Sequence, residues 1–330
     1  MIRKAKNLIA FTLRTGISIF ASVLIHLLKR ITAYNVGGPV VFRDDNLILM
    51  RDHYYSPIPS RSDFVEDGFF GKARDLPGVV IDAERIKSYI REDLPQALEL
   101  FRARLPAISE KEANGGFYLV NGRYMAVDAH IYFAMILQKR PKKIIEIGSG
   151  KSTEVALSAC QLLRDEGHEV ELICIEPYPS QDFLNVVSEN NVTLIKKLVQ
   201  NVPLDFFSSL ENGDILFIDS THVLREGSDV QYEYLEILPR LKSGIHVHVH
   251  DISLPKRYPE VYFTGGLYWN EQYFLQAFLI NNSKINITWP GNYMMCSCPE
   301  LMLETFPEIK DMRRKYPSSE PSAFWFKTCE

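Results

Sequence analysis

Beyond residue 126 the chain alternates between two patterns of apolar and polar positions. Short apolar runs of strand length are separated by longer segments in which apolar residues recur at helical spacing. The strand-like runs lie at 142–147, 170–175, 192–195, 214–219, 244–250, 285–289 and 323–328, and the helical segments at 152–164, 230–238 and 267–279. Strands that are apolar almost throughout and alternate with helices predict a parallel, doubly wound α/β sheet.

The chain ahead of residue 126 lacks this alternation. Residues 31–125 are expected to form a leading accessory region, with helical spacing only at 83–90 and 94–104. Residues 1–30 are expected to form a separate N-terminal helix that is apolar and basic. The main domain is then expected to span 126–330.

The N-terminal helix has an apolar run at 8–28 with basic residues on both sides. The run is long enough to span a bilayer, but Arg14 lies inside it, and a charge there costs at least ~2.5 kcal/mol. The basic flanks suit a helix that lies on an anionic membrane surface. Packing against the main domain or against a second subunit is an equal alternative, so a membrane surface and a homo-oligomer both stay open as partners.

Composition narrows the class of protein without naming a function. The chain of 330 residues is 46% apolar and 24% charged, as in ordinary globular proteins. Its net charge of −4 argues against nucleic acid as a partner. The five cysteines are scattered and lack the two pairs of a zinc knuckle, so reduced thiols are expected. We expect a cytoplasmic protein, peripheral at the inner membrane face where the N-terminal helix binds membrane.

The strongest chemical signal is the segment 146–153, which follows a strand and opens a helix. This places it at the carboxyl edge of the sheet, where ligands bind. Gly148 and Gly150 let the backbone approach a ligand closely. A phosphate-binding Walker A loop is excluded, because its first glycine would fall on Ile145 and Glu146 would repel the phosphate.

Two cofactor classes remain. A dinucleotide fingerprint would have its third glycine at Thr153, which weakens the case for an NAD(P)-dependent oxidoreductase without eliminating it. S-adenosylmethionine has no phosphate and carries two cationic groups, so Glu146 before the glycines suits it. Glu176 ends the second strand and can accept hydrogen bonds from ribose hydroxyls. The expected cofactor contacts are Glu146, Gly148, Ser149, Gly150, Ser152, Glu176 and Asp219.

The segment 146–150 resembles the first motif of class I S-adenosylmethionine-dependent methyltransferases. That resemblance implies a Rossmann-like sheet, mostly parallel, with an antiparallel pair of strands at the C-terminal end. The intact set of Glu146, Gly148, Gly150 and Glu176 speaks against the remaining alternative, a non-catalytic, membrane-tethered interaction module.

Two neighbouring strand ends bring further polar side chains to the same edge. Asp219 and His222 follow the fourth strand, and His250 and Asp251 follow the fifth. Carboxylates on adjacent strands suit Mg²⁺, and a bound ion would acidify a substrate hydroxyl. His222 would then take the proton, with metal ligands at Asp219, His250 and Asp251. Structural roles in the loop remain open for Asp219 and His222.

The histidines at 246, 248 and 250 alternate along one strand. Successive members lie about 7 Å apart, too far for one zinc ion. For His246 and His248 we expect buried, hydrogen-bonded positions in the sheet.

Residues 52–330 resemble a bacterial methyltransferase family related to macrolide-sugar O-methyltransferases. The matching segments are 53–59, 128–129, 146–153, 219–222, 250–252, 269–273 and 323–325. The resemblance implies methyl transfer to a hydroxyl of a sugar, glycan or glycosylated natural product, with Asp219 as metal ligand and His222 as base. The family carries two acids at the fifth strand end, where this chain has His250 and Asp251. The segment 268–272 is expected either to contact the sugar or to cap and pack a helix.

Overall fold

The computed structural model describes residues 18–27, 40–44, 47–50, 56–64 and 68–330. The chain divides into two compact units, Met1–Val65 and Glu66–Glu330. The pattern change near residue 126 does not coincide with this division. The helices between 83 and 104 lie in the second unit, where Ile86 and Phe101 share a hydrophobic core with Ile131.

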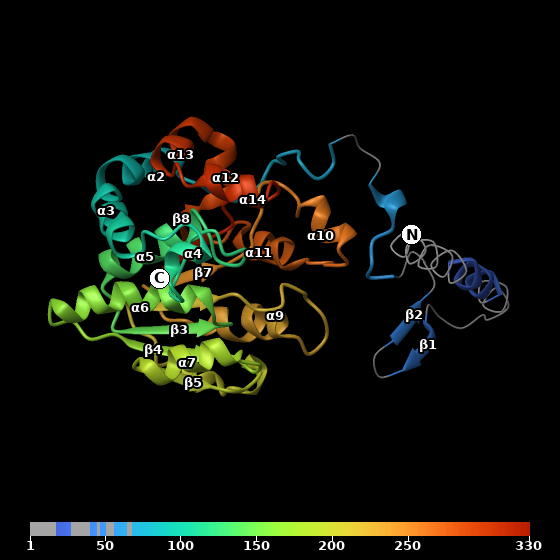
Figure 1. Ribbon diagram of the computed structural model, residues 1–330, viewed down its shortest axis with the longest axis horizontal. Coiled ribbons are helices and arrows are strands. Elements are labelled where there is room, and N and C mark those ends of the chain that lie inside the picture. The colour runs from blue at the N-terminus through green and yellow to red at the C-terminus, as the bar shows by residue number, and fades with distance from the viewer. Residues whose placement is uncertain (1–17, 28–39, 45–46, 51–55, 65–67) are drawn as a thin grey trace, which may run out of the picture. The chain divides into compact units, whose positions relative to one another are not determined.

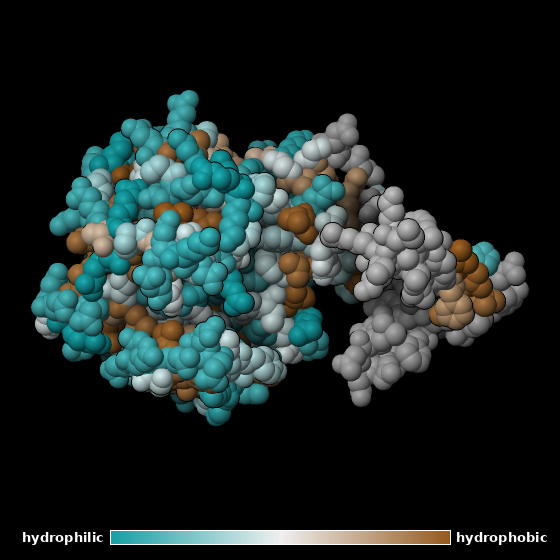
Figure 2. All heavy atoms as spheres, viewed as in Figure 1, coloured by the Kyte–Doolittle hydropathy of each residue, from teal (hydrophilic) through white to brown (hydrophobic). Residues whose placement is uncertain are grey.

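In the first unit the structure describes a helix, a hairpin and a single short turn of 3-10 helix, η1 (Arg61–Asp63). The helix spans 18–27, and the hairpin pairs β1 (Val40–Asp44) with β2 (Leu47–Met50). The helix leaves apolar side chains open to solvent, with Ile19 61% and Phe20 71% exposed, and it shows as brown in Figure 2. The rest of the expected N-terminal helix lies outside the described residues. Among those described, no helix combines the length and apolarity needed to cross a membrane.

The second unit is built on a seven-stranded sheet (Figure 1). Its strand order is β5-β4-β3-β6-β7-β9-β8; the first five are parallel, and β9 is antiparallel to both β7 and β8. The strands are β3 (Lys143–Ile147), β4 (Glu171–Ile175), β5 (Val192–Ile195), β6 (Ile215–Ile218), β7 (His246–Val249), β8 (Ile285–Pro290) and β9 (Phe324–Thr328). The predicted α/β, Rossmann-like sheet with its antiparallel C-terminal pair is confirmed.

Helices cover both faces of this sheet. The helices of this unit are α2 (Ala83–Ser88), η2 (Tyr89–Asp93), α3 (Pro95–Arg104), α4 (Glu110–Ala113), α5 (Asp128–Lys139), α6 (Lys151–Asp165), α7 (Gln181–Glu189), η3 (Val199–Asn201), α8 (Leu204–Phe207), α9 (Asp229–Tyr232), η4 (Glu233–Ile237), η5 (Leu238–Arg240), α10 (Glu260–Thr264), α11 (Glu271–Leu279), α12 (Gly291–Ser297), α13 (Pro299–Thr305) and α14 (Ile309–Lys315). Successive strand residues point to opposite faces, so Ile144 joins one core and Ile145 the other. Because both faces are covered, the inner strands are mainly apolar, as the pattern predicted, and Glu146, His246 and His248 are buried polar exceptions.

Helix α5 is the longest element that the pattern did not predict. Every residue from Asp128 to Ile136 is buried, because the helix packs against both α3 and α6. A helix buried all round has no polar face, so it lacks the amphipathic spacing by which helices are found in a sequence.

Candidate active site

The loops after β3, β4, β6 and β7 meet at one edge of the sheet. The chain order reverses between β3 and β6, and ligands bind at such a switch point in open α/β sheets. A cavity of about 700 Å³ opens at this edge, and a second of about 220 Å³ adjoins it. Gly148, Glu176 and Asp219 line both cavities, so the two form one continuous site.

Most residues predicted from the sequence lie on the wall of the larger cavity. They are Gly148, Ser149, Gly150, Ser152, Glu176, Asp219, His250 and Asp251. Glu146 and His222 are absent from that wall and lie behind it.

Gly148 and Gly150 have different structural roles in the loop. Gly148 has a φ of +79°, and a Cβ there would overlap the carbonyl oxygen of Asp219, so it lets the ends of β3 and β6 pack closely. Nothing lies within 4 Å of a Cβ built on Gly150, which lines the cavity. A side chain at position 150 would therefore extend into the space of a bound ligand.

The structure changes the expectation that Glu146 contacts the cofactor. Its fully buried carboxylate accepts hydrogen bonds from Tyr132 Oη at 2.9 Å, from Cys174 Sγ at 3.4 Å and from Thr153 Oγ1. Thr153 Oγ1 in turn accepts the Gly150 amide at 3.2 Å. Burial raises the pKa of Glu146 to about 7. Glu146 thus holds the loop in place from the side away from the cavity. Thr153 links Glu146 to the Gly150 amide, and it occupies the position where a dinucleotide fingerprint has its third glycine.

Glu176 is placed as expected for a ribose contact. It follows β4, lines both cavities, and accepts the amides of Tyr178 at 2.8 Å and Ser149 at 3.4 Å. The smaller cavity beyond it has an apolar floor that includes Ile175 and Val199. A flat apolar ring system with an attached diol matches this arrangement.

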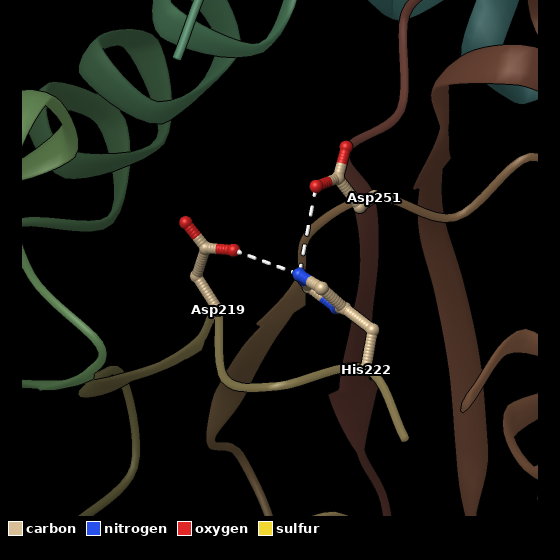
Figure 3. Close-up of side chains that lie close together, drawn as sticks. All are labelled: Asp219, His222 and Asp251. Carbon is tan, nitrogen blue, oxygen red and sulfur yellow. Dashed lines mark ion pairs between the residues drawn. The ribbon is translucent and has the colours of Figure 1, made fainter. Parts of the chain in front are cut away.

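A cluster of acids and imidazoles lies where β6 and β7 end. His222 Nε2 lies 3.4 Å from Asp219 Oδ1 and 3.5 Å from Asp251 Oδ2, as Figure 3 shows. Its Nδ1 lies 2.8 Å from Glu271 Oε2, a carboxylate with no exposure to solvent. The surrounding carboxylates raise the pKa of His222 well above its usual value despite burial. The carboxylates therefore favour the protonated form of His222, whereas a general base must be neutral.

His250 is held on the other side of Asp219. Its Nδ1 lies 3.2 Å from Asp219 Oδ1, and its Nε2 lies 3.4 Å from Asp128 Oδ2. Asp128 is fixed by Ser322 and by the Ala323 amide at 2.9 Å. The pKa of His250 is raised by Asp251, Asp219 and Asp128 despite its burial. Although burial opposes ionisation, His250 and His222 hold the pKa of Asp219 well below its usual range, so Asp219 stays ionised.

Two members of the cluster have left-handed backbone conformations. His222 has a φ of 61° and Asp251 a φ of 55°. Non-glycine residues adopt this region at a cost of order 1–3 kcal/mol, and they gather at functional sites. The His222 carbonyl accepts the amides of Asn270 at 3.0 Å and Glu271 at 3.2 Å, which holds the turn against the start of α11.

Sequence reasoning did not assign Asp128 or Glu271 to the acidic cluster. Asp128 carried a signal only as part of a matching segment, and Glu271 was expected to contact sugar or pack the helix; Glu271 is buried and faces His222. Gln272 is also fully buried and holds the loop after β7. His246 and His248 are buried as expected, but the Nδ1 atoms of both lack a hydrogen-bond partner among the described residues.

Comparisons with known proteins agree with this geometry. Residues 145–252 match the family described as methyltransferase domain. An uncharacterized protein of Archaeoglobus fulgidus is 32% identical over 202 residues, covering 59% of this chain and 89% of that protein. The chain belongs to the same family as this archaeal protein. It is an S-adenosylmethionine-dependent methyltransferase. The segment 146–153, which we expect to bind the cofactor and call the cofactor loop, lies inside the matched domain, as does Glu176.

Solved methyltransferase structures are more distant. The methyltransferase PaMTH1 of Podospora anserina, bound to S-adenosyl-L-homocysteine (SAH), is 16% identical to this chain and has a TM-score of 0.39. The match covers 75% of this chain and 95% of PaMTH1. The plantazolicin methyltransferase BpumL, in complex with an analog and SAH, is 12% identical, covers 75% and 100%, and has a TM-score of 0.38. Similarity at this level assigns no substrate.

Proposed function

We propose that the enzyme methylates a hydroxyl group of a sugar, glycan or glycosylated natural product. The main support is that a single cavity is lined by the cofactor loop, by residues of the acidic cluster and by aromatic side chains. Trp269 and Tyr262 form that wall, with ring centroids 4.7 Å apart. Aromatic faces with carboxylates beside them suit the apolar face and the hydroxyls of a sugar ring.

The reaction is an in-line displacement in which the acceptor oxygen bonds to the methyl carbon as the carbon–sulfur bond breaks. The sulfonium becomes a neutral thioether, and the hydroxyl loses its proton. We propose that this proton passes to Asp251 Oδ1. This carboxylate oxygen belongs to a residue of the cavity wall and accepts a hydrogen bond from Ser322 Oγ at 3.3 Å. The main contribution of the protein is to hold the two reactants in line.

A divalent cation fits the cluster, with ligands that differ from those expected. Single ligand atoms of Asp219, His222 and Asp251 lie within 4.8 Å of one another. His222 would be a ligand in place of His250, and Glu271 behind its Nδ1 matches the carboxylate that orients most metal-bound imidazoles.

Charge balance supports the same site. Four carboxylates, Asp128, Asp219, Asp251 and Glu271, surround two imidazoles. With His222 neutral, as a metal ligand must be, and His250 protonated, the cluster keeps three negative charges, and a divalent cation offsets two of them. Such an ion would acidify an acceptor hydroxyl.

We also propose that the N-terminal region contacts an anionic membrane surface. The support is the exposed apolar side chains of helix 18–27, such as Ile19 and Phe20, and the basic residues on either side of it in the sequence.

The reaction is tested by measuring SAH release from S-adenosylmethionine in the presence of sugars, glycans and glycosides. We expect release to depend on one of these acceptors and to fall on Asp251→Asn by roughly 10²–10⁴. Release that occurs only with amines or thiols would contradict O-methylation, while leaving methyl transfer itself in place.

A further inference from the structure

We propose that the acceptor carries an anionic oxygen group, a phosphate or a carboxylate, which binds the ammonium group of Lys256. The inference rests on the proposed function, because it names a property of the acceptor in the same cavity. Lys256 follows β7 in the loop that also carries Asp251, and both residues line the larger cavity. The cofactor loop follows β3, two strands away in the sheet.

The backbone of Lys256 is fixed before any ligand binds. Its amide donates to the Ser253 carbonyl at 2.8 Å, which closes a turn. The buried Gln272 side chain accepts the Ser253 amide at 2.9 Å and donates to the Lys256 carbonyl at 3.3 Å. Binding therefore orders only the lysine side chain, which lowers the entropy cost of capturing a ligand.

The ammonium group of Lys256 lacks a carboxylate partner among the residues that the structure describes. The Lys256 residue is partly buried, and the thiol of Cys296 lies near it, since the Lys256 charge acts to lower the pKa of that thiol against the larger effect of burial. Without a carboxylate nearby, the ammonium group gains no ion-pair energy from the protein. An anionic ligand would supply that missing interaction.

Other cationic side chains on the cavity wall are already satisfied. Lys151 pairs with Glu154 at 2.6 Å, and Arg257 donates to the Phe69 carbonyl at 2.9 Å. Arg123 is exposed, so water can solvate it.

The nearby acids do not neutralise Lys256 either. Glu320 is bound by Arg313 at 2.6 Å, and among the described residues no ion pair joins the exposed Glu260 to Lys256. Lys256 thus differs from Lys151, which has a carboxylate partner, and from Arg257, which donates to a carbonyl and packs on the Phe69 ring.

The test is isothermal titration of the SAH-loaded, full-length protein with three probes: glucose 1-phosphate, glucuronate and glucose. We expect at least one anionic probe to bind roughly 10- to 100-fold more tightly than glucose, the range for a charge-assisted hydrogen bond. If glucose 1-phosphate binds more tightly than glucuronate, the anionic group of the acceptor is a phosphate, and the reverse order indicates a carboxylate.

Variants test whether Lys256 causes the preference for anionic probes over glucose. Lys256→Met should abolish this preference, and Lys256→Arg should retain most of it. Lys310→Met is the matched control, because Lys310 is an exposed lysine of α14 outside the cavity wall, and it should change nothing.

Equal binding of the three probes, or no binding of either anion at millimolar concentration, overturns the proposal. It is also overturned if Lys256→Met weakens SAH binding itself, since Lys256 would then hold the carboxylate of the cofactor. Absence of SAH binding to the wild-type protein would defeat the proposed function and this inference together, and so is distinguishable from loss of anion preference alone.

Discussion

At the scale of single residues, the cofactor loop depends on one glycine for packing and on another for open space. Gly148→Ala would place a methyl group against the Asp219 carbonyl with a φ of +79°. Strain and overlap together should lower the free energy of unfolding by about 2–5 kcal/mol. Gly150→Ala meets no neighbour and should change it by less than about 1 kcal/mol. Urea denaturation measures both, and equal stability of the two variants would contradict this packing.

Glu146 gives a prediction of pH dependence. Burial raises the pKa of Glu146 from 4.5, the ordinary value that holds in the unfolded chain, to about 7 in the fold. The protonated carboxyl therefore stabilises the fold fully below pH 4.5, and this contribution is lost as pH rises through 7. The change is about 3 kcal/mol.

Glu146→Gln does not titrate, so the stability of the wild type relative to this variant should fall by that amount over the same pH range. Denaturation midpoints of both proteins at several pH values provide the measurement. A difference that stays constant with pH would show that Glu146 is ionised in its buried position.

At the scale of elements, the start of α11 supports the acidic cluster from behind. Glu271→Gln removes the carboxylate at His222 Nδ1. If the cluster binds a divalent cation, Mn²⁺ affinity should fall roughly 10- to 100-fold, as for other lost partners of metal-bound imidazoles. SAH affinity should not change, since Glu271 lies outside the cavity wall. Calorimetric titration with Mn²⁺ checks this, and an unaltered affinity would remove His222 from the ligand set.

The predictable parts of the fold and the unpredictable ones differ in physical origin. Strands β3, β4 and β6 were found because burial on both faces leaves a nearly continuous apolar run, and parallel strands necessarily bring Gly148, Glu176, Asp219 and Asp251 to one edge. The separate roles of the two histidines could not be found in this way. They depend on the left-handed turn at His222 and on carboxylates from α5 and α11, which lie far away in the sequence.

At the scale of the whole molecule, the chain combines a catalytic unit with an N-terminal unit that has an exposed apolar helix. Deletion of residues 1–30 should leave SAH binding intact, because the site lies wholly in the unit that begins at Glu66. The same deletion should abolish flotation with anionic liposomes, and neutral liposomes should float the full-length protein less. Equal flotation with and without residues 1–30 would exclude this region as the membrane contact.

The most direct test of the central claim is calorimetric titration of the full-length protein with SAH and, separately, with NAD⁺. The geometry predicts that SAH binds at one site per chain and that NAD⁺ does not. Gly150→Leu should abolish SAH binding by filling the cavity, whereas Gly116→Leu should preserve it, because Gly116 is exposed and lies outside the cavity wall. Binding of NAD⁺ in preference to SAH, or unchanged SAH binding in a folded Gly150→Leu variant, would contradict the account.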